Sequence, residues 1–72
     1  MLNRIEMFPE DLKNIRKKLG LTQGKFAEKL GYSTRSMICH FEKGTRPISP
    51  RVALLCGYFI RDLEEGRLVS NN

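Results

Sequence analysis

The chain has 72 residues, of which 40% are hydrophobic and 29% charged, and its formal net charge is +5. This length predicts one domain over residues 1–72 with a modest core, which a second copy of the chain would help to stabilise. No apolar run reaches the roughly 18 residues of a membrane span. The polar start is unlike a secretory signal, so we expect a cytoplasmic protein of a bacterium or a phage-infected cell.

Cysteine and histidine are too few for a zinc site with four nitrogen and sulfur ligands. The chain has two cysteines, Cys39 and Cys56, and His40 as its only histidine. A reducing compartment favours two free thiols over a disulfide. Cys39 and His40 are adjacent, and adjacent residues of a helix do not face each other. We therefore expect no enzyme, no metal, no cofactor and no small-molecule ligand.

The first predicted helix spans about residues 9–19. Pro9 suits the first turn of a helix because its missing N–H has no partner there. Gly20 favours a left-handed cap that ends the helix. The residues before the helix are interpreted as a short arm. The inward stripe consists of Leu12, Ile15 and Leu19.

The second predicted helix spans about residues 23–30. Thr22 is a suitable N-cap, and Gly31 supplies the turn that follows. The inner face consists of Phe26, Ala27 and Leu30. The small side chain of Ala27 favours a close crossing with another helix.

The third predicted helix spans about residues 34–43. Ser33 or Thr34 would cap it, and Gly44 would end it. Ile38 and Phe41 have the spacing of a buried face. The opposite face is polar and basic, with Arg35, Ser36, Cys39, His40 and Lys43.

The fourth predicted helix spans about residues 50–64, with Ser49 as its cap and Pro50 as its first residue. Gly57 is either tolerated within this helix or divides it in two. The result is an all-α fold of four to five helices. The apolar face is broader than one small core needs, which predicts a homodimer. The expected interface residues are Tyr58, Phe59, Ile60 and Leu63.

Positive charge is concentrated in the middle of the chain. Residues 13–51 contain ten basic and two acidic residues, a sum of +8, whereas residues 1–12 sum to −2 and residues 52–72 to −1. This distribution suits binding to the phosphates of a nucleic acid. The alternative is an ordinary solvated surface.

Two short helices joined by a tight turn indicate a helix-turn-helix unit. The strongest motif begins with GLTQ at Gly20, continues with FAEKLG at Phe26 and ends with FEKGTRP at Phe41. With these residues, the stretch from Leu12 to Pro47 resembles the lambda-repressor-like, Cro-type (xenobiotic-response-element) helix-turn-helix family. The chain is one residue longer than the usual spacing between Gly31 and Gly44, and we place the extra residue near Tyr32–Ser33.

The resemblance implies a regulator that binds double-stranded DNA, with the third helix in the major groove. It implies that Gln23, at the start of the second helix, contacts a phosphate. The side chains expected to read bases are Arg35, Ser36 and His40. The side chains expected to contact phosphates are Gln23, Lys25, Thr34, Lys43, Thr45 and Arg46.

One such helix reads only four or five base pairs, so we expect a dimer on an inverted-repeat operator with half-sites about 34 Å apart. A chain without an effector domain favours repression, including repression of its own gene. Its subclass stays open among a phage switch, an antitoxin, a restriction-control protein and an anti-CRISPR-associated autoregulator. The alternative function is a protein-interaction module, either an antitoxin or an adaptor, that uses the face of the fourth helix.

Overall fold

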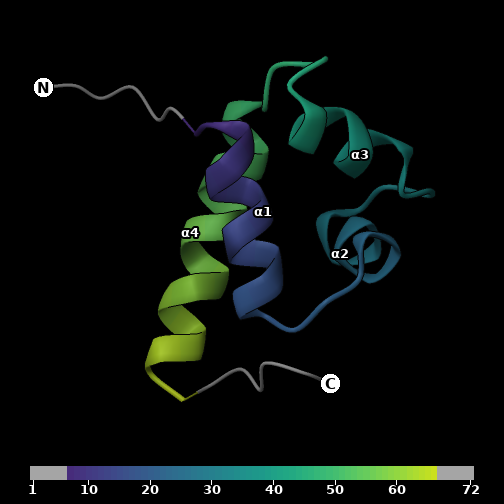
Figure 1. Ribbon diagram of the computed structural model, residues 1–72. Coiled ribbons are helices and arrows are strands. Elements are labelled where there is room, and N and C mark those ends of the chain that lie inside the picture. Colours follow the sequence, from purple (N-terminus) through teal and green to yellow (C-terminus); the bar gives the residue numbers. More distant parts are fainter. Residues whose placement is uncertain (1–6, 67–72) are drawn as a thin grey trace, which may run out of the picture.

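The computed structural model describes residues 7–66, which form four α helices (Figure 1). The helices are α1 (Pro9–Lys18), α2 (Gln23–Leu30), α3 (Ser36–Lys43) and α4 (Pro50–Glu64). The described residues include no strand, and the all-α helix-turn-helix fold expected from the sequence is confirmed. Most of the expected N-terminal arm, residues 1–6, and the tail after Gly66 lie outside the described residues.

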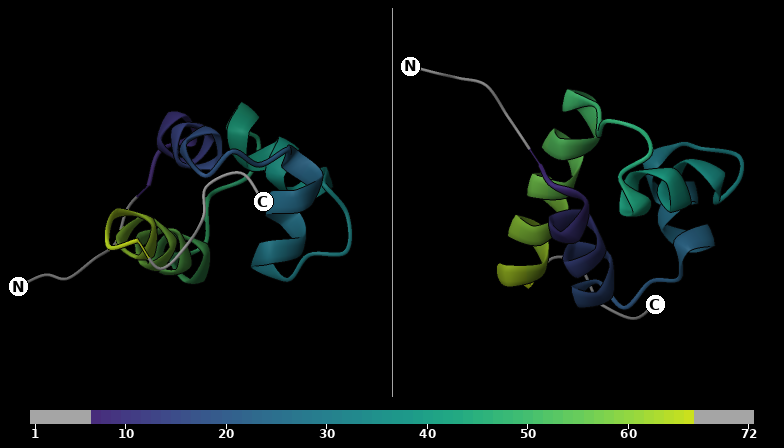
Figure 2. Two further views of the ribbon diagram at one scale, coloured as in Figure 1. Left: turned by 90° about the horizontal axis from the view of Figure 1, so that it is seen from below. Right: turned by 45° about the horizontal axis from the view of Figure 1, so that its top comes forward.

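The helices form two pairs. α1 and α4 lie side by side and run in the same general direction, and α2 and α3 pack together beside α1 (Figures 1 and 2). α1 contacts both α3 and α4, so it joins the two pairs. This arrangement leaves α3 at the periphery of the molecule, far from most of α4.

Side-chain caps fix the starts of α2 and α4 where the sequence predicts them. The Thr22 hydroxyl accepts a hydrogen bond from the Lys25 backbone N–H at 3.1 Å. The Ser49 hydroxyl accepts from the Val52 N–H at 3.3 Å, and Pro50 is the first residue of α4. Each cap supplies a partner for an N–H that the helix itself cannot pair.

The third helix begins at Ser36, two residues after the expected start at about residue 34. The Thr34 hydroxyl accepts from the Ser36 N–H at 3.3 Å, a local bond that competes with helix formation. Arg35 is the N-cap residue and contributes no side-chain cap. Residues 31–35 therefore connect α2 to α3, beginning with Gly31 at a φ of 91°. Tyr32 and Ser33, near which the extra residue is expected, lie in this connection.

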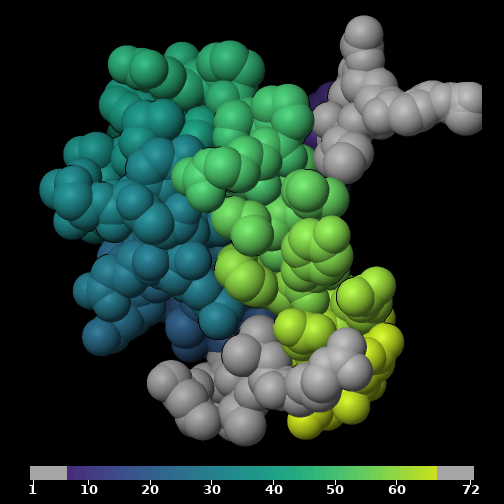
Figure 3. Space-filling model, turned by 180° about the vertical axis from the view of Figure 1, so that it is seen from behind, coloured from purple at the N-terminus to yellow at the C-terminus, as the bar shows by residue number. Residues whose placement is uncertain are grey.

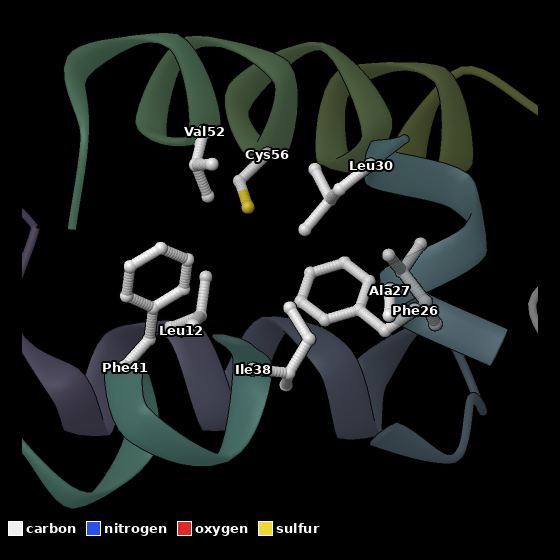
Figure 4. Packing of buried hydrophobic residues seen from close by; sticks show 9 residues of the cluster. Leu12, Phe26, Ala27, Leu30, Ile38, Phe41, Val52 and Cys56 are labelled. Carbon is white, nitrogen blue, oxygen red and sulfur yellow. The ribbon is translucent and has the colours of Figure 1, made fainter. Parts of the chain in front are cut away.

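The core lies where all four helices meet (Figure 4). Leu12 of α1, Phe26 of α2 and Val52 of α4 are fully buried. Ile38 and Phe41 of α3 point into the same cluster, so the core fixes how α3 sits against the other helices. The complete buried cluster is Leu12, Leu19, Phe26, Ala27, Leu30, Ile38, Phe41, Val52 and Cys56.

α4 continues through Gly57 without a break, so the described part of the chain has four helices and not five. Figure 3 shows α4 along one face of the molecule, beside the surface of α2 and α3. Leu54 and Tyr58 are 46% and 47% exposed, whereas Phe59 and Leu63 pack against the core. None of the described helices has the length and apolar character needed to cross a membrane.

Candidate nucleic-acid interface

α3 has one buried face and one exposed polar face. Ile38 and Phe41 are buried, and Ser36, His40 and Lys43 are exposed. Positions spaced by four and three residues share one side of a helix, so these three exposed side chains point in a common direction. Cys39, beside them, is half-buried. The helix thus offers a hydroxyl, an imidazole and an ammonium group to a partner.

Arg35, at the start of α3, contacts the first residue of α2. Its Nη1 donates to the Gln23 side-chain oxygen at 3.1 Å. The Gln23 Nε2 in turn donates to Oε1 of Glu42 at 3.0 Å. Gln23 therefore links an exposed guanidinium to a carboxylate near the end of α3, and its own amide is held in one orientation.

Glu42 also holds α3 against α1. Arg16 Nε lies 2.6 Å from Oε2 of Glu42, and Nη2 lies 3.3 Å from Oε1. Arg16 Nη1 donates to the Leu21 carbonyl at 3.0 Å. The two charged side chains are only 13% and 6% exposed, so water screens their attraction poorly. Sequence reasoning gave Glu42 no role, although it is one of only two acidic residues in the basic stretch 13–51.

His40 and Thr45 form a second polar contact at the other end of α3. His40 Nδ1 lies 2.8 Å from the Thr45 hydroxyl, which also donates to the His40 carbonyl at 3.2 Å. The Thr45 backbone N–H donates to the same carbonyl at 3.0 Å. Gly44, with a φ of 80°, makes the turn that brings Thr45 back over the helix end.

The side chains expected to contact phosphates fall into separate places. Gln23 and Lys25 lie at the start of α2, and Lys25 Nζ lies 4.0 Å from Glu28 with both side chains 70% exposed. The Thr34 hydroxyl, just before α3, accepts from a backbone N–H. Lys43 lies on the exposed face of α3, and Thr45 and Arg46 follow the end of that helix; all three are exposed.

Two basic residues of the middle stretch make contacts within the protein. The Arg16 side chain is largely buried in its pair with Glu42. Arg51 Nη2 donates to the Leu30 carbonyl at 3.2 Å, and its guanidinium lies 5.7 Å from the centre of the Tyr32 ring. These two arginines connect helices, while their charge still adds to the positive field of this half of the molecule.

The expected dimer residues occupy different sides of α4. Tyr58 is exposed, and Arg61 lies over its ring at 5.5 Å. Phe59 is partly buried, and Lys29 lies over its ring at 4.6 Å. Ile60 lines a mostly apolar hollow between α1 and α4, and Leu63 packs against the core. Leu54, one turn before Tyr58, was not in the expected set but is equally exposed.

A family model described as Helix-turn-helix, HTH_3, matches residues 12–56, which is more than half of the chain. The chain belongs to this family. The match runs from the first buried leucine of α1 to Cys56 of α4 and includes all of α2 and α3. No curated protein and no solved structure gives a significant match.

Membership of HTH_3, the Cro/C1 type, makes this chain a DNA-binding protein of the kind found in transcriptional regulators. The family is not an enzyme family, which agrees with the expectation from the sequence. Both cysteines, Cys39 and Cys56, are free thiols. Within residues 7–66, no group of three or more histidine, cysteine, aspartate or glutamate side chains could hold a metal ion.

Proposed function

We propose that this protein is a dimeric repressor that binds an inverted-repeat operator through α3 in the major groove. The observation that carries the proposal is the exposed polar face of α3, whose opposite face is buried in the core. A helix in the major groove must present side chains that donate and accept hydrogen bonds, and Ser36, His40 and Arg35 provide them. The positive charge of residues 13–51 supplies attraction to phosphates.

Arg35 is the proposed reader of guanine. A guanidinium has five N–H groups and can donate two of them to O6 and N7 of one guanine. Gln23 uses a single N–H of Arg35, so four are free for the base. Gln23 thereby restricts where the guanidinium points, which lowers the entropy that binding would cost.

The test is Arg35→Ala, with Arg35→Lys as the matched variant that keeps the charge. Duplexes selected from a randomised pool first give the cognate site. Arg35→Ala should lose about 1–3 kcal/mol on that site and relax preference at one base pair, because base contacts carry the specificity. Arg35→Lys should keep binding to random DNA but lose the same preference. Equal losses on cognate and random DNA would reduce Arg35 to a phosphate contact.

Gln23, Lys25, Thr34, Lys43 and Arg46 are the proposed phosphate contacts. The Gln23 Nε2 donates one N–H to Glu42 and has a second N–H for a phosphate. Gln23 also lies at the start of α2, the positive end of that helix's dipole. The affinity for DNA should fall with salt, and the slope of log affinity against log salt should be about −0.9 per neutralised phosphate. Lys43→Ala should make that slope less steep by about one unit, and a flat salt response would contradict the proposal.

The proposed dimer forms through α4, with Tyr58 at the centre of the contact. Tyr58 and Leu54 are exposed apolar side chains one turn apart, as expected for a surface that a second copy covers. Phe59, Ile60 and Leu63 are partly buried and would pack between this surface and the rest of the protein. A two-fold dimer would set the two α3 helices at half-sites about 34 Å apart.

Sedimentation tests the dimer with Tyr58→Asp and Leu54→Asp. Both changes should give monomers with unchanged helix content, because these side chains contribute little to the core. Phe59→Asp is a poorer test, since Phe59 packs against the core and its loss would also destabilise the monomer. An unchanged dimer in both exposed variants would argue against α4 as the interface.

The exposed Leu54 and Tyr58 also favour a second candidate, a protein-interaction module that binds another protein through α4. Retention on heparin and a gel shift with the DNA upstream of its own gene distinguish the two functions. Binding to that DNA supports the repressor. A folded protein that binds no DNA at any salt concentration supports the module.

A further inference from the structure

The hydroxyl of Thr45 determines which ring nitrogen of His40 carries a proton. Thr45 Oγ1 lies 2.8 Å from Nδ1 of His40 and 3.2 Å from the His40 carbonyl oxygen. A hydroxyl has one proton to donate, whereas a carbonyl oxygen can only accept. The two contacts can therefore both be hydrogen bonds in only one arrangement.

In that arrangement the Thr45 hydroxyl donates to the carbonyl and accepts from Nδ1–H of the imidazole. If the hydroxyl instead donated to Nδ1, two oxygen lone pairs would face each other across 3.2 Å with no proton between them. The carbonyl also accepts from the Thr45 backbone N–H at 3.0 Å, so its two lone pairs are both used. The neutral ring thus carries its proton on Nδ1 and has a bare lone pair on Nε2.

His40 is exposed on the same face of α3 as Ser36, one turn away. The nitrogen that does not contact Thr45 is the one left for a ligand. In the major groove the exocyclic amino groups of adenine and cytosine are the donors, while guanine O6 and N7 and thymine O4 are acceptors. An acceptor nitrogen discriminates between these two groups of bases, because two acceptors that meet leave both without a proton.

We propose that His40 is a specificity-determining residue that accepts a hydrogen bond from the amino group of adenine or cytosine, and that Thr45 is the positioning residue that makes Nε2 an acceptor. This inference rests on the proposed function, in which α3 enters the major groove. The partner of His40 is then a nucleobase and not a phosphate, because phosphate oxygens only accept hydrogen bonds and cannot donate one to Nε2. It also gives Thr45 a role through His40 in place of a direct phosphate contact.

The first experiment measures the tautomer without DNA. Nitrogen-15 NMR of the His40 ring at about pH 8.5, where an ordinary imidazole carries no charge, distinguishes protonated Nδ1 from protonated Nε2. Wild type and Thr45→Ser, which keeps the hydroxyl, should both show the proton on Nδ1. Thr45→Val, which has nearly the same shape but no hydroxyl, should shift protonation toward Nε2. A proton on Nε2 in the wild type would overturn the proposal.

The second experiment selects bound duplexes from a randomised pool with the same three proteins. Wild type and Thr45→Ser should select adenine or cytosine at one position of each half-site. Thr45→Val should lose that preference by about tenfold while keeping the bases selected by Arg35, because one mismatched hydrogen bond changes and the rest remain. Guanine or thymine at that position in the wild type, or an unchanged preference in Thr45→Val, would overturn the proposal.

The two experiments separate this inference from the proposed function. If the wild type binds no DNA, both the repressor and base reading by His40 are refuted, and the NMR measurement alone decides the tautomer. If DNA binds with a preference at the Arg35 position but none at the His40 position, the repressor stands and the role of His40 falls. Circular dichroism of Thr45→Val checks that the end of α3 remains folded.

Discussion

Replacing Glu42 with alanine should cost about 3 kcal/mol of unfolding free energy. The carboxylate accepts hydrogen bonds from Arg16 and Gln23, and its loss leaves the Arg16 side chain, which is only 13% exposed, without its carboxylate partner. Removing one member of a buried ion pair typically costs about 3–5 kcal/mol, and the partial access of Arg16 to water favours the lower end. In a domain of this size the melting temperature falls by about 4–8 °C per kcal/mol, so we expect a decrease of about 12–24 °C.

Thermal and urea unfolding followed by circular dichroism measure this effect. Glu28→Ala is the matched control, because Glu28 is also a helical glutamate near a basic side chain but is 70% exposed and 4.0 Å from Lys25. It should change stability by less than about 0.5 kcal/mol. The double variant Arg16→Met with Glu42→Leu should be more stable than Glu42→Ala, since it buries no unpaired charge.

Two results would refute the reasoning. A Glu42→Ala protein as stable as Glu28→Ala would mean that burial adds nothing to the pair with Arg16. A double variant whose loss equals the sum of the separate Arg16→Met and Glu42→Leu losses would mean that the two side chains are not energetically coupled.

Three further predictions concern α4 and the thiols. Gly57→Ala should raise the unfolding free energy by about 0.5–1 kcal/mol in urea titrations, because a Cβ there meets nothing within 4 Å; a loss of stability would contradict the open space at Gly57. Burial raises the pKa of the Cys56 thiol from 9.0 to about 11, so the unfolded chain loses this proton first and stability should fall as the pH rises between these values. The stability of Cys56→Ala should lack that part of the pH dependence. Identical pH profiles of stability for this variant and the wild type would refute the prediction. A thiol reagent at neutral pH should modify the half-buried Cys39 promptly and the buried Cys56 only as the protein unfolds. Equal rates of modification for the two thiols would contradict the burial of Cys56 in the core.

Local signals in the sequence were sufficient for most helix boundaries. The observed bounds of α2 and α4 coincide with the expected 23–30 and 50–64. Thr22 and Ser49 each cap their own helix by a hydrogen bond to the backbone N–H three residues later, which is a local interaction. The start of α3 lies two residues after the expected position for a related reason. Thr34 also bonds a nearby N–H, but it does so from a turn that precedes the helix, and the residue pattern does not distinguish these geometries.

The contacts that organise the candidate site could not be read from periodicity. Arg16 and Glu42 are 26 residues apart, and Gln23 and Glu42 are 19 apart, so their meeting depends on how α1, α2 and α3 cross. The same holds for α4, where the pattern identified an apolar helix but not which side the core would cover. Phe59 proved partly buried and Leu54 exposed, although both are large apolar residues in one helix.

The chain of contacts from Arg16 through Glu42 and Gln23 to Arg35 is buried at one end and exposed at the other. Mutational tolerance should follow the same gradient. Under the proposed function, in which Arg35 reads a base, a substitution at Arg35 would alter the recognised operator at little cost to folding. A substitution at Glu42 would disturb the packing of α3 against α1 before it could alter recognition. New binding specificities would therefore arise most readily by substitution of Arg35, with the buried ion pair between Arg16 and Glu42 unchanged.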